Sequence, residues 1–349
     1  MKVLLLIPKR YTLTEMLMEN FKKIGWDVVI LDDSEILPHL FGVLYNKTVG
    51  FPKILIKNWK QYYYRKVNEI YLKNFAQNEP DLVVVYNNQF TLPSTLKEFK
   101  KYSKISFILG DNPLYSDTFN YNLEILKYSD YTVCPDSFWR DQLTSIGLKN
   151  VFLDFIGYDK NIFFKAINIP KEIFNRFNSD ALFIGRAYRG ASGFKRAAFY
   201  NEIKINNFKI FGNSEWLDSF ESFPDLQKKF IVLKENISNS ELNFALNSTR
   251  VYPIEQNKGI INGIHLRVFE SIGAGTLPIV EWRKDVEDLF GANIPTVKNY
   301  SELNRKILYY LNNERERTDI TKYLKAILDK KYSPFIFVKN IIQHTGLTH

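Results

Sequence analysis

The sequence predicts an α/β protein built from two doubly wound parallel sheets that follow one another along the chain. Its 349 residues are enough for two domains, because a domain usually holds roughly 100–200 residues. Short apolar runs alternate with amphipathic stretches of helical period, which predicts right-handed β-α-β units and a parallel sheet covered on both faces. This alternation begins again near residue 181, so we expect a second sheet there.

The first half opens with a buried strand at Val3–Leu6, a helix at Leu13–Ile24 and a second strand at Val28–Leu31. Further strands are expected where β-rich runs are bounded by Asp, Gly, Pro or Asn, with helices between them. The strands are Leu82–Tyr86, Ile105–Leu109, Tyr131–Cys134 and Val151–Phe155, and the helices are Leu96–Tyr102 and Ser137–Ile146. The aromatic stretch Phe51–Phe75 is expected to form a helix that packs on the sheet edge or borders an acceptor site.

The second half is expected to start after a connector at Gly157–Asn178. Its predicted strands are Ala181–Ile184, Phe208–Phe211, Ile231–Leu233, Val251–Tyr252, Leu277–Val280 and Pro295–Val297. Its predicted helices are Phe194–Ile203, Ser240–Leu246, Leu266–Ile272 and Glu302–Leu311. We therefore place the first domain at residues 1–160 and the second at residues 161–330. Because ligands of open α/β sheets bind at the carboxyl ends of the strands, we expect the chemistry in a cleft between the two domains.

Composition narrows the class of protein and its partners. The chain carries 47 Lys and Arg against 38 Asp and Glu, of which residues 1–160 hold 20 and 18, leaving 27 and 20 for the rest. The basic excess of the second half favours an anionic ligand there. The alternative is that the lysines are ordinary solvated surface residues without a ligand. A single cysteine, Cys134, excludes an intramolecular disulfide and a multi-cysteine zinc site. The first apolar run is too short for a membrane span or a secretory signal, so we expect a soluble, cytoplasmic protein.

Several familiar ligand-binding motifs are missing from the sequence. The turn after the first strand reads Pro8-Lys9-Arg10 instead of G-x-G-x-x-G, and the sequence has neither a G-x-x-x-x-G-K-[ST] loop nor a G-x-S-x-G elbow. The four histidines lack zinc spacing, and no D-x-D pair is present to hold a divalent metal. If the protein handles a diphosphate, we expect arginines and backbone amides to bind it, with neither metal nor cofactor.

A glycine-rich turn in the second half offers such a site. The stretch Gly185–Arg196 follows the strand Ala181–Ile184 and contains three glycines beside four basic residues, Arg186, Arg189, Lys195 and Arg196. Glycines let backbone N–H groups approach a ligand closely, and the start of the following helix favours an anion. Basic side chains add charge-assisted hydrogen bonds to phosphate oxygens. A solvated basic loop without a ligand is the alternative.

A second cluster lies on the predicted helix Ile264–Ile272. Arg267 and Glu270 are three residues apart and therefore neighbours on the helix surface. An arginine near a helix start can contact a diphosphate, and a carboxylate can bind the two hydroxyls of a ribose. Gly273 and Gly275 then allow a tight turn into the next strand. The alternative is a surface Arg–Glu pair, which contributes less than about 1 kcal/mol.

These residues form the pattern R-x-F-E-x-x-x-x-G, from Arg267 to Gly275, followed by an apolar strand and Asp288-Leu289-Phe290. In this the sequence resembles the CgeB-like (spore maturation protein-like) glycosyltransferases. Other segments resemble that family in the same order, over roughly residues 104 to 300. They are Gly110-Asp111-Asn112-Pro113, Cys134-Pro135-Asp136, Gly157-Tyr158-Asp159 and Phe183-Ile184-Gly185 with Arg196.

The resemblance implies the GT-B fold, in which two Rossmann-like domains face each other across a cleft. It implies transfer of a sugar, in a hexosyltransferase-like reaction, from a nucleotide-diphosphate sugar such as a UDP sugar to a hydroxyl of a glycan, protein or other polymer. Arg267 and the Gly185–Arg189 turn would hold the diphosphate and Glu270 the ribose, while Gly273 and Gly275 would allow close approach. Residues 331–349 would form a helix that crosses back to the first domain.

The resemblance leaves the stereochemistry of transfer open. Related retaining enzymes often carry two glutamates spaced E-x7-E, and Asn262 stands at the first of these positions. An inverting reaction needs a base for the acceptor hydroxyl, and we expect Asp111, at the end of a first-domain strand, to be that base. Asp111 is alternatively a turn-capping residue. His265 is a second catalytic candidate, either donating to the sugar or packing at the helix start.

Two other classes of function remain open at this point. A nucleotide-sugar epimerase shares the two-domain plan and acts on the donor alone. A nucleic-acid-binding protein is suggested by the basic pI of about 9.2 and by the interleaved Tyr and Lys of Trp59–Lys73. A transferase that glycosylates modified DNA would combine sugar transfer with nucleic-acid binding. The sequence does not predict an oligomeric state.

Overall fold

The chain divides into two compact units, Met1–Phe155 with Pro334–His349 and Ile156–Ser333. The computed structural model describes residues 1–9, 11–32, 35, 53–87, 90–114, 122–235 and 237–347. Each unit contains a six-stranded sheet whose described strand pairs are all parallel. This confirms the predicted fold class, two Rossmann-like α/β domains.

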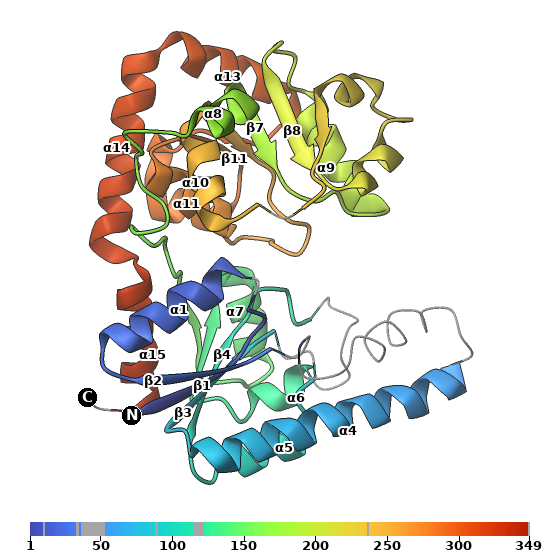
Figure 1. Cartoon of the computed structure of the whole chain (residues 1–349), viewed down its shortest axis with the longest axis vertical. Coiled ribbons are helices and arrows are strands. Elements are labelled where there is room, and N and C mark those ends of the chain that lie inside the picture. The colour runs from blue at the N-terminus through green and yellow to red at the C-terminus, as the bar shows by residue number, and fades with distance from the viewer. Residues whose placement is uncertain are drawn as a thin grey trace. The chain divides into compact units, whose positions relative to one another are not determined.

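The first sheet has the strand order β2-β1-β3-β4-β5-β6 (Figure 1). Its strands are β1 (Lys2–Leu6), β2 (Asp27–Leu31), β3 (Leu82–Tyr86), β4 (Lys104–Ile108), β5 (Tyr131–Cys134) and β6 (Val151–Leu153). Its helices are α1 (Thr12–Lys23), α4 (Lys53–Asn78), α5 (Pro93–Phe99), α6 (Asn122–Leu126), α7 (Ser137–Ser145) and α15 (Pro334–Thr345). Helix α15 comes from the end of the chain and packs beside α1 and against β4 and β5.

The second sheet has the strand order β12-β11-β10-β7-β8-β9. Its strands are β7 (Ser179–Ile184), β8 (Phe208–Gly212), β9 (Phe230–Val232), β10 (Thr249–Ile254), β11 (Leu277–Glu281) and β12 (Thr296–Val297). Its α-helices are α8 (Lys171–Phe177), α9 (Ala191–Asn201), α10 (Asn239–Asn247), α11 (Leu266–Ala274), α12 (Lys284–Phe290), α13 (Leu303–Asn312) and α14 (Glu314–Lys331). Short 3-10 helices lie at Ser214–Ser219, Pro224–Lys229, Gly291–Asn293 and Tyr300–Glu302.

An aromatic core supports the start of the candidate site in the second unit. Phe183, near the end of β7, has its ring centroid 4.3 Å from that of Tyr200 and 5.8 Å from that of Trp216. Such tilted and edge-to-face pairs stabilise a core beyond simple burial. Trp216 also donates a hydrogen bond from its indole nitrogen to the carbonyl of Gly185, at 3.0 Å. The turn after β7 is thereby fixed to the core beneath it.

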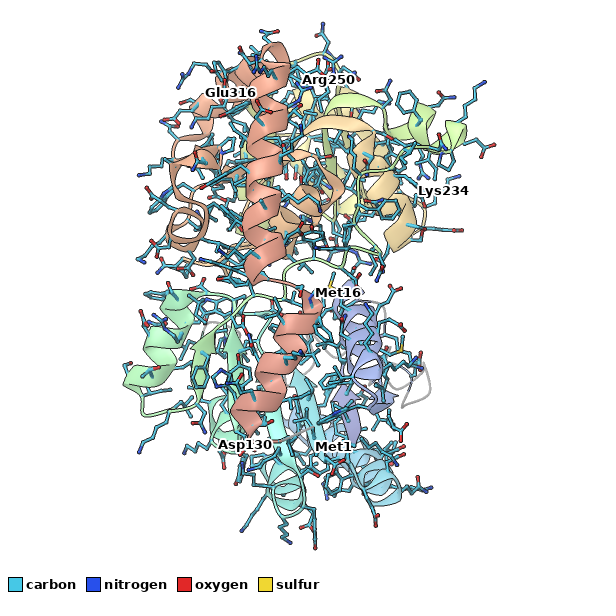
Figure 2. The ribbon with its side chains drawn as sticks, turned by 90° about the vertical axis from the view of Figure 1, so that its left-hand side faces the viewer. Met1, Met16, Asp130, Lys234, Arg250 and Glu316 are labelled. Carbon is cyan, nitrogen blue, oxygen red and sulfur yellow. The ribbon has the colours of Figure 1, made fainter. Side chains whose placement is uncertain are left out.

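Three α-helices of the second unit, α8, α12 and α14, were not predicted. Helix α8 lies inside the segment expected to be a connector, and α14 is an 18-residue helix that begins Glu-Arg-Glu-Arg. Figure 2 shows α14 along its whole length, with Glu316 labelled near its amino end. Only Thr321, Leu324 and Leu328 of this helix are fully buried, so its apolar stripe is too narrow to stand out in the sequence.

The aromatic stretch of the first unit forms α4, which runs from Lys53 to Asn78. Its described face buries Tyr63, Val67, Tyr71 and Phe75, so the aromatics serve as core residues. Phe51, the expected start of this helix, lies outside the described residues. Among the helices that the structure describes, none is both long enough and apolar enough to cross a membrane.

Candidate functional site

The candidate site lies at the carboxyl ends of β7 and β10 in the second unit. In chain order β7 is the first strand of this sheet and β10 the fourth, and the winding of the sheet reverses between them. Ligands of doubly wound sheets bind in the crevice outside the strand ends at such a reversal. Here Gly185 follows β7, Glu255 follows β10, and α11 begins at Leu266 nearby in the fold.

Arg267 joins the turn after β7 to the first turn of α11. Its guanidinium carbon lies 5.0 Å from the centroid of the Phe183 ring, a cation–π contact. A Cβ atom at Gly185 would lie 2.5 Å from Nη2 of Arg267, so only glycine allows this approach. Within the part of the chain that the structure describes, Nη1 of Arg267 is enclosed and has no hydrogen-bond partner. The guanidinium therefore keeps hydrogen-bonding capacity that the protein itself does not use.

The other arginines of the turn divide between surface and interior. Arg186 is exposed, and Arg189 is exposed with its Nε 3.7 Å from Glu215. Arg196 is only 1% exposed; it donates from Nη1 to the carbonyl of Arg186 at 2.7 Å and from Nε to Glu255 at 2.9 Å. Arg196 was predicted to contact a ligand; in the structure, burial and its ion pair with Glu255 hold it beneath the turn, where it supports the backbone.

The turn leads directly into α9. Gly190 precedes the helix with a φ of +63°, and it has no side chain to cap the first N–H groups. An uncapped helix start with its positive dipole end is a ready site for an anion. The exposed Arg186 and Arg189 stand in the same turn, so this part of the edge is strongly electropositive.

A network of charges lies under the strand ends. Lys195 of α9 contacts Glu255 and Glu281, which follow or end neighbouring strands, at 2.7 Å each. Glu281 also pairs with Arg283 at 3.1 Å and accepts a hydrogen bond from Tyr300 at 3.0 Å. Burial alone would raise the pKa of Glu281, but Lys195 and Arg283 together lower it below its usual value. Lys195 is thus engaged by two carboxylates and fixes α9 to the sheet.

Glu270 lies one helical turn after Arg267 and is 7% exposed. Its carboxylate makes no hydrogen bond and no ion pair with any residue that the structure describes. Burial raises its pKa to about 7, and the charge of Arg267 partly opposes this rise. A buried carboxylate without partners is costly, so a ligand that donates hydrogen bonds to it would relieve that cost.

His265 caps the start of α11. Its ring Nδ1 accepts a hydrogen bond from the backbone N–H of Arg267 at 3.2 Å, and its backbone N–H donates to Oε1 of Gln256 at 3.0 Å. Burial, together with the charges of Arg267 and Arg196, lowers the pKa of His265 well below its usual value. The ring is therefore neutral at pH 7, with its proton on Nε2, where it can donate to a ligand. Nδ1 is already occupied.

The two glycines at the end of α11 lie away from this site. Gly273 and Gly275 follow Leu266 by seven and nine residues, which places them about 10–14 Å along the helix axis. A Cβ at Gly273 would overlap the ring of Tyr158, and Gly275 ends the helix with a φ of +80°. Both were predicted to allow close approach of the donor; in the structure they lie at the end of α11 opposite to Arg267. Asn262 lies before the helix, where its carbonyl accepts from the N–H of Asp285 at 2.8 Å.

Asp111 belongs to the first unit and follows β4. Asn87, after β3, donates from Nδ2 to its carboxylate at 2.8 Å and accepts from the backbone N–H of Gly110 at 2.6 Å. Asp111 reaches the surface, yet the surrounding protein raises the pKa of its carboxyl, while the bond from Asn87 opposes this. A small pocket opens nearby at the reversal between β1 and β3, lined in part by Pro8, Tyr86 and Asn87.

The sequence analysis missed Asn87, Glu255, Glu281 and Arg283. Each follows or ends a predicted strand, which is the one signal that could have singled them out. Among the residues that the structure describes, no group of three or more His, Cys, Asp or Glu side chains could hold a metal ion.

The two six-stranded parallel sheets with their helices have the GT-B fold. The solved structures that resemble the whole chain include a protein named for sucrose phosphate and two complexes with UDP or a UDP sugar. Sucrose-phosphate synthase of Thermosynechococcus elongatus has a TM-score of 0.72 and 10% identity, covering 98% of this chain and 97% of that one. An E. coli trehalose-6-phosphate structure with bound UDP-2-fluoro glucose has a TM-score of 0.69 and 11% identity, with 100% of both chains covered. Anabaena Alr3699/HepE in complex with UDP and glucose has a TM-score of 0.65 and 12% identity, with 99% of both chains covered.

In sequence, residues 194–335 match the family described as "Glycosyl transferase-like". The matched segment includes α9, α11 and the strand ends β10 and β11, so it contains Lys195, Arg267 and Glu270. No curated protein matches the sequence. The structural likenesses, at identities of 10–12%, establish the fold that this chain shares with those proteins.

Proposed function

We propose that this protein is a glycosyltransferase that moves a sugar from a nucleotide-diphosphate sugar to a hydroxyl acceptor without a metal ion. One observation carries the proposal: the partnerless, buried carboxylate of Glu270 lies one turn from the guanidinium of Arg267 at the strand reversal. A diphosphate needs cations, and the ribose beside it offers two hydroxyls to a carboxylate. The match to a glycosyl transferase-like family covers this part of the chain.

The diphosphate would lie over the turn after β7. Arg267 and the exposed Arg186 supply cations, with Arg189 at the rim, and the uncapped start of α9 supplies backbone N–H groups. When the sugar leaves, negative charge grows on the departing diphosphate, and fixed cations stabilise that charge most. Arg196 contributes indirectly, by holding the carbonyl of Arg186 and so the shape of the turn.

Proton transfer from the acceptor needs a base, and Asp111 is our candidate. Its raised pKa makes it a better proton acceptor than an ordinary surface aspartate, and Asn87 fixes its orientation. His265 suits a different role, because its Nδ1 already accepts from the backbone and its Nε2 proton can only be donated. It would donate to the sugar or phosphate of the donor.

We propose UDP as the nucleotide, since two of the similar structures hold UDP or a UDP sugar. The finer assignment, a CgeB-like, metal-independent hexosyltransferase of the cytoplasm, extends the proposal and rests on the R-x-F-E-x-x-x-x-G pattern from Arg267 to Gly275. The acceptor would be a glycan, a protein or another hydroxyl-bearing polymer.

Calorimetry with UDP, GDP, dTDP and CMP sugars tests the proposal. We expect one nucleotide class to bind, and Glu270→Ala to weaken that binding at least tenfold, since a hydrogen bond to a charged group contributes about 1.5–3 kcal/mol. Glu172→Ala, on the exposed surface of α8, is the matched control and should bind as the wild type does. Undiminished affinity in Glu270→Ala would refute the ribose role, and a strict requirement for Mg²⁺ or Mn²⁺ would refute the metal-free reaction.

A further inference from the structure

A large polar groove lies at the opposite edge of the second sheet. It is bounded by the amino ends of β7, β10 and β11 on one side and by the inner face of α14 on the other. Its volume is about 590 Å³, within the range of roughly 300–1,000 Å³ typical of small-molecule sites. Figure 2 shows Arg250, which lines the groove at the start of β10, beside the amino-terminal part of α14.

This groove, called the basic groove below, is separate from the proposed sugar-nucleotide site. The sugar-nucleotide site uses the carboxyl ends of the strands, and the basic groove uses the amino ends of the same strands. β7 and β10 each contain six residues, so the two edges are about 15–20 Å apart. No residue of the groove belongs to the turn after β7 or to the first two turns of α11.

The groove carries an excess of positive charge. Five of its lining residues are cationic, namely Lys165, Arg250, Arg317, Lys322 and Lys325, and one, Glu314, is acidic. Arg250 pairs with Asp180 at 3.4 Å, and Arg317 pairs with Glu314 at 3.6 Å. Lys165 and Lys322 form no hydrogen bond and no ion pair with the residues that the structure describes. Two ammonium groups of the groove are therefore unneutralised.

Two further cations of the groove, Arg317 and Lys325, are partly buried, which disfavours their charged form. Burial lowers the pKa of Lys325 from its usual value, and nearby Lys160 adds to this, while Asp329 opposes it. Burial likewise lowers the pKa of Arg317, with Arg250 adding to the effect and Glu314 opposing it. A bound anion would relieve the cost of keeping these groups charged and would thereby stabilise the second unit.

The spacing of the cations indicates the shape of the ligand. Arg317 and Lys325 are eight residues apart on α14, which separates them by about 12 Å along the helix, and Lys322 lies between them. A single phosphate group cannot reach across that length. The hydroxyl groups of Thr318 and Thr321 donate to backbone carbonyls of the helix, so ligand binding would depend on the cations.

We propose that the basic groove binds a small, elongated anion with two or more phosphate or carboxylate groups, at a site distinct from that of the sugar nucleotide. The inference does not depend on the proposed transferase activity. Because the groove shares β7, β10 and β11 with the sugar-nucleotide site, its occupancy would stabilise the same sheet from the other edge.

The test is calorimetry of the full chain with tripolyphosphate, inorganic phosphate and citrate. We expect tripolyphosphate or citrate to bind at least tenfold more tightly than phosphate, with an affinity that falls as NaCl increases. The comparison between tripolyphosphate and citrate distinguishes phosphate from carboxylate ligands. The double variant Lys165→Ala/Lys322→Ala should lose at least tenfold in affinity. Lys127→Ala/Lys149→Ala, two exposed lysines of the first unit, is the matched control and should bind normally.

Because a diphosphate site would also attract tripolyphosphate, the location of binding is measured as well. Hydrogen exchange should slow in residues 314–325 on addition of the anion, and Arg186→Ala should leave this protection unchanged. If binding is lost in Arg186→Ala but kept in Lys165→Ala/Lys322→Ala, the groove is not the site, although the sugar-nucleotide proposal survives. Absence of any slowing in α14 would overturn the inference too.

Discussion

At the scale of single residues, the arginines of the turn after β7 have opposite roles. Arg196 is buried against Glu255, whereas Arg186 is exposed ten residues earlier. Arg196→Met should destabilise the second unit by about 3 kcal/mol. The substitution leaves Glu255 buried with one partner fewer and removes the hydrogen bond that Arg196 donates to the carbonyl of Arg186. Urea denaturation of the variant measures this loss.

Arg186→Met provides the matched comparison. Its side chain is exposed and makes no ion pair with described residues, so the substitution should change stability by less than about 0.5 kcal/mol. It should instead weaken sugar-nucleotide binding. If both variants unfold at the same urea concentration, the division between a supporting and a binding arginine is wrong.

Glu270 gives a prediction about pH. Its folded-state pKa of about 7 lies above the usual value of 4.5. Between pH 4.5 and pH 7 the carboxyl group therefore keeps its proton in the folded protein and loses it in the unfolded chain. Wild-type stability therefore falls as pH rises from about 4.5 to 7, and the cost of the buried charge is complete above pH 7. Glu270→Gln removes that cost and should be more stable than the wild type by roughly 3 kcal/mol at pH 8.

The same variant should nearly match the wild type near pH 4.5, where the carboxyl group is protonated in the folded state and half protonated in the unfolded chain. Denaturation curves at pH 4.5 and pH 8 give the comparison, and Glu172→Gln on the exposed face of α8 should show no difference at either pH. An advantage of Glu270→Gln that is equal at both pH values would contradict the role of ionisation.

Arg267 and Glu270 could be predicted because a single helix places them three residues apart at a strand-entry turn. The charge network could not, since its members meet only after the sheet forms. Lys195 is 60 residues from Glu255 and 86 from Glu281 along the chain. The burial of Arg196 was missed for the same reason. A basic residue in a glycine-rich stretch is expected to be solvated, and its buried partner Glu255 lies 59 residues later in the sequence, after β10.

At the scale of elements, buried parallel strands were predictable and polar helices were not. Leu82–Tyr86 and Tyr131–Cys134 match β3 and β5 residue for residue, because a strand covered on both faces is a continuous apolar run. Helix α14 offers only a narrow buried stripe in an 18-residue, highly charged segment. Its stability comes from packing against α11, α13 and β11, which the local sequence does not reveal.

Helix α11 depends on a close contact with the segment that leads into the second unit. Gly273 faces the ring of Tyr158, whose hydroxyl group bonds Lys325 and Asp329 of α14. Gly273→Ala should destabilise the second unit by about 1–3 kcal/mol, because the added methyl group must displace this ring. Thermal unfolding measures the loss.

A double-mutant cycle tests the cause. In a Tyr158→Ala background, Gly273→Ala should cost less than about half as much, since the ring is gone. An unchanged cost would show that helix propensity or another neighbour, not Tyr158, makes glycine necessary at this position.

At the scale of the whole molecule, the first unit is discontinuous in sequence. Helix α15 follows the second unit along the chain, yet it packs on α1, β4 and β5 and buries Phe337, Val338, Ile341 and Ile342. The first sheet therefore completes its core only when the last residues of the chain are in place. Both this helix and the unit to which it belongs were expectations taken from the family resemblance.

This arrangement predicts where a distant substitution acts. Ile341 of α15 is fully buried, and Ile341→Ala should destabilise the first unit by about 2–5 kcal/mol through loss of buried methyl groups and the cavity left behind. In native-state hydrogen exchange, amides of β1, β3 and β4 should lose protection while those of β7, β10 and β11 keep theirs. Ile272→Ala, equally buried in α11, is the matched control and should reverse the pattern. If Ile341→Ala instead lowers protection equally in both sheets, the two units unfold together and the division of the chain into two stable bodies fails.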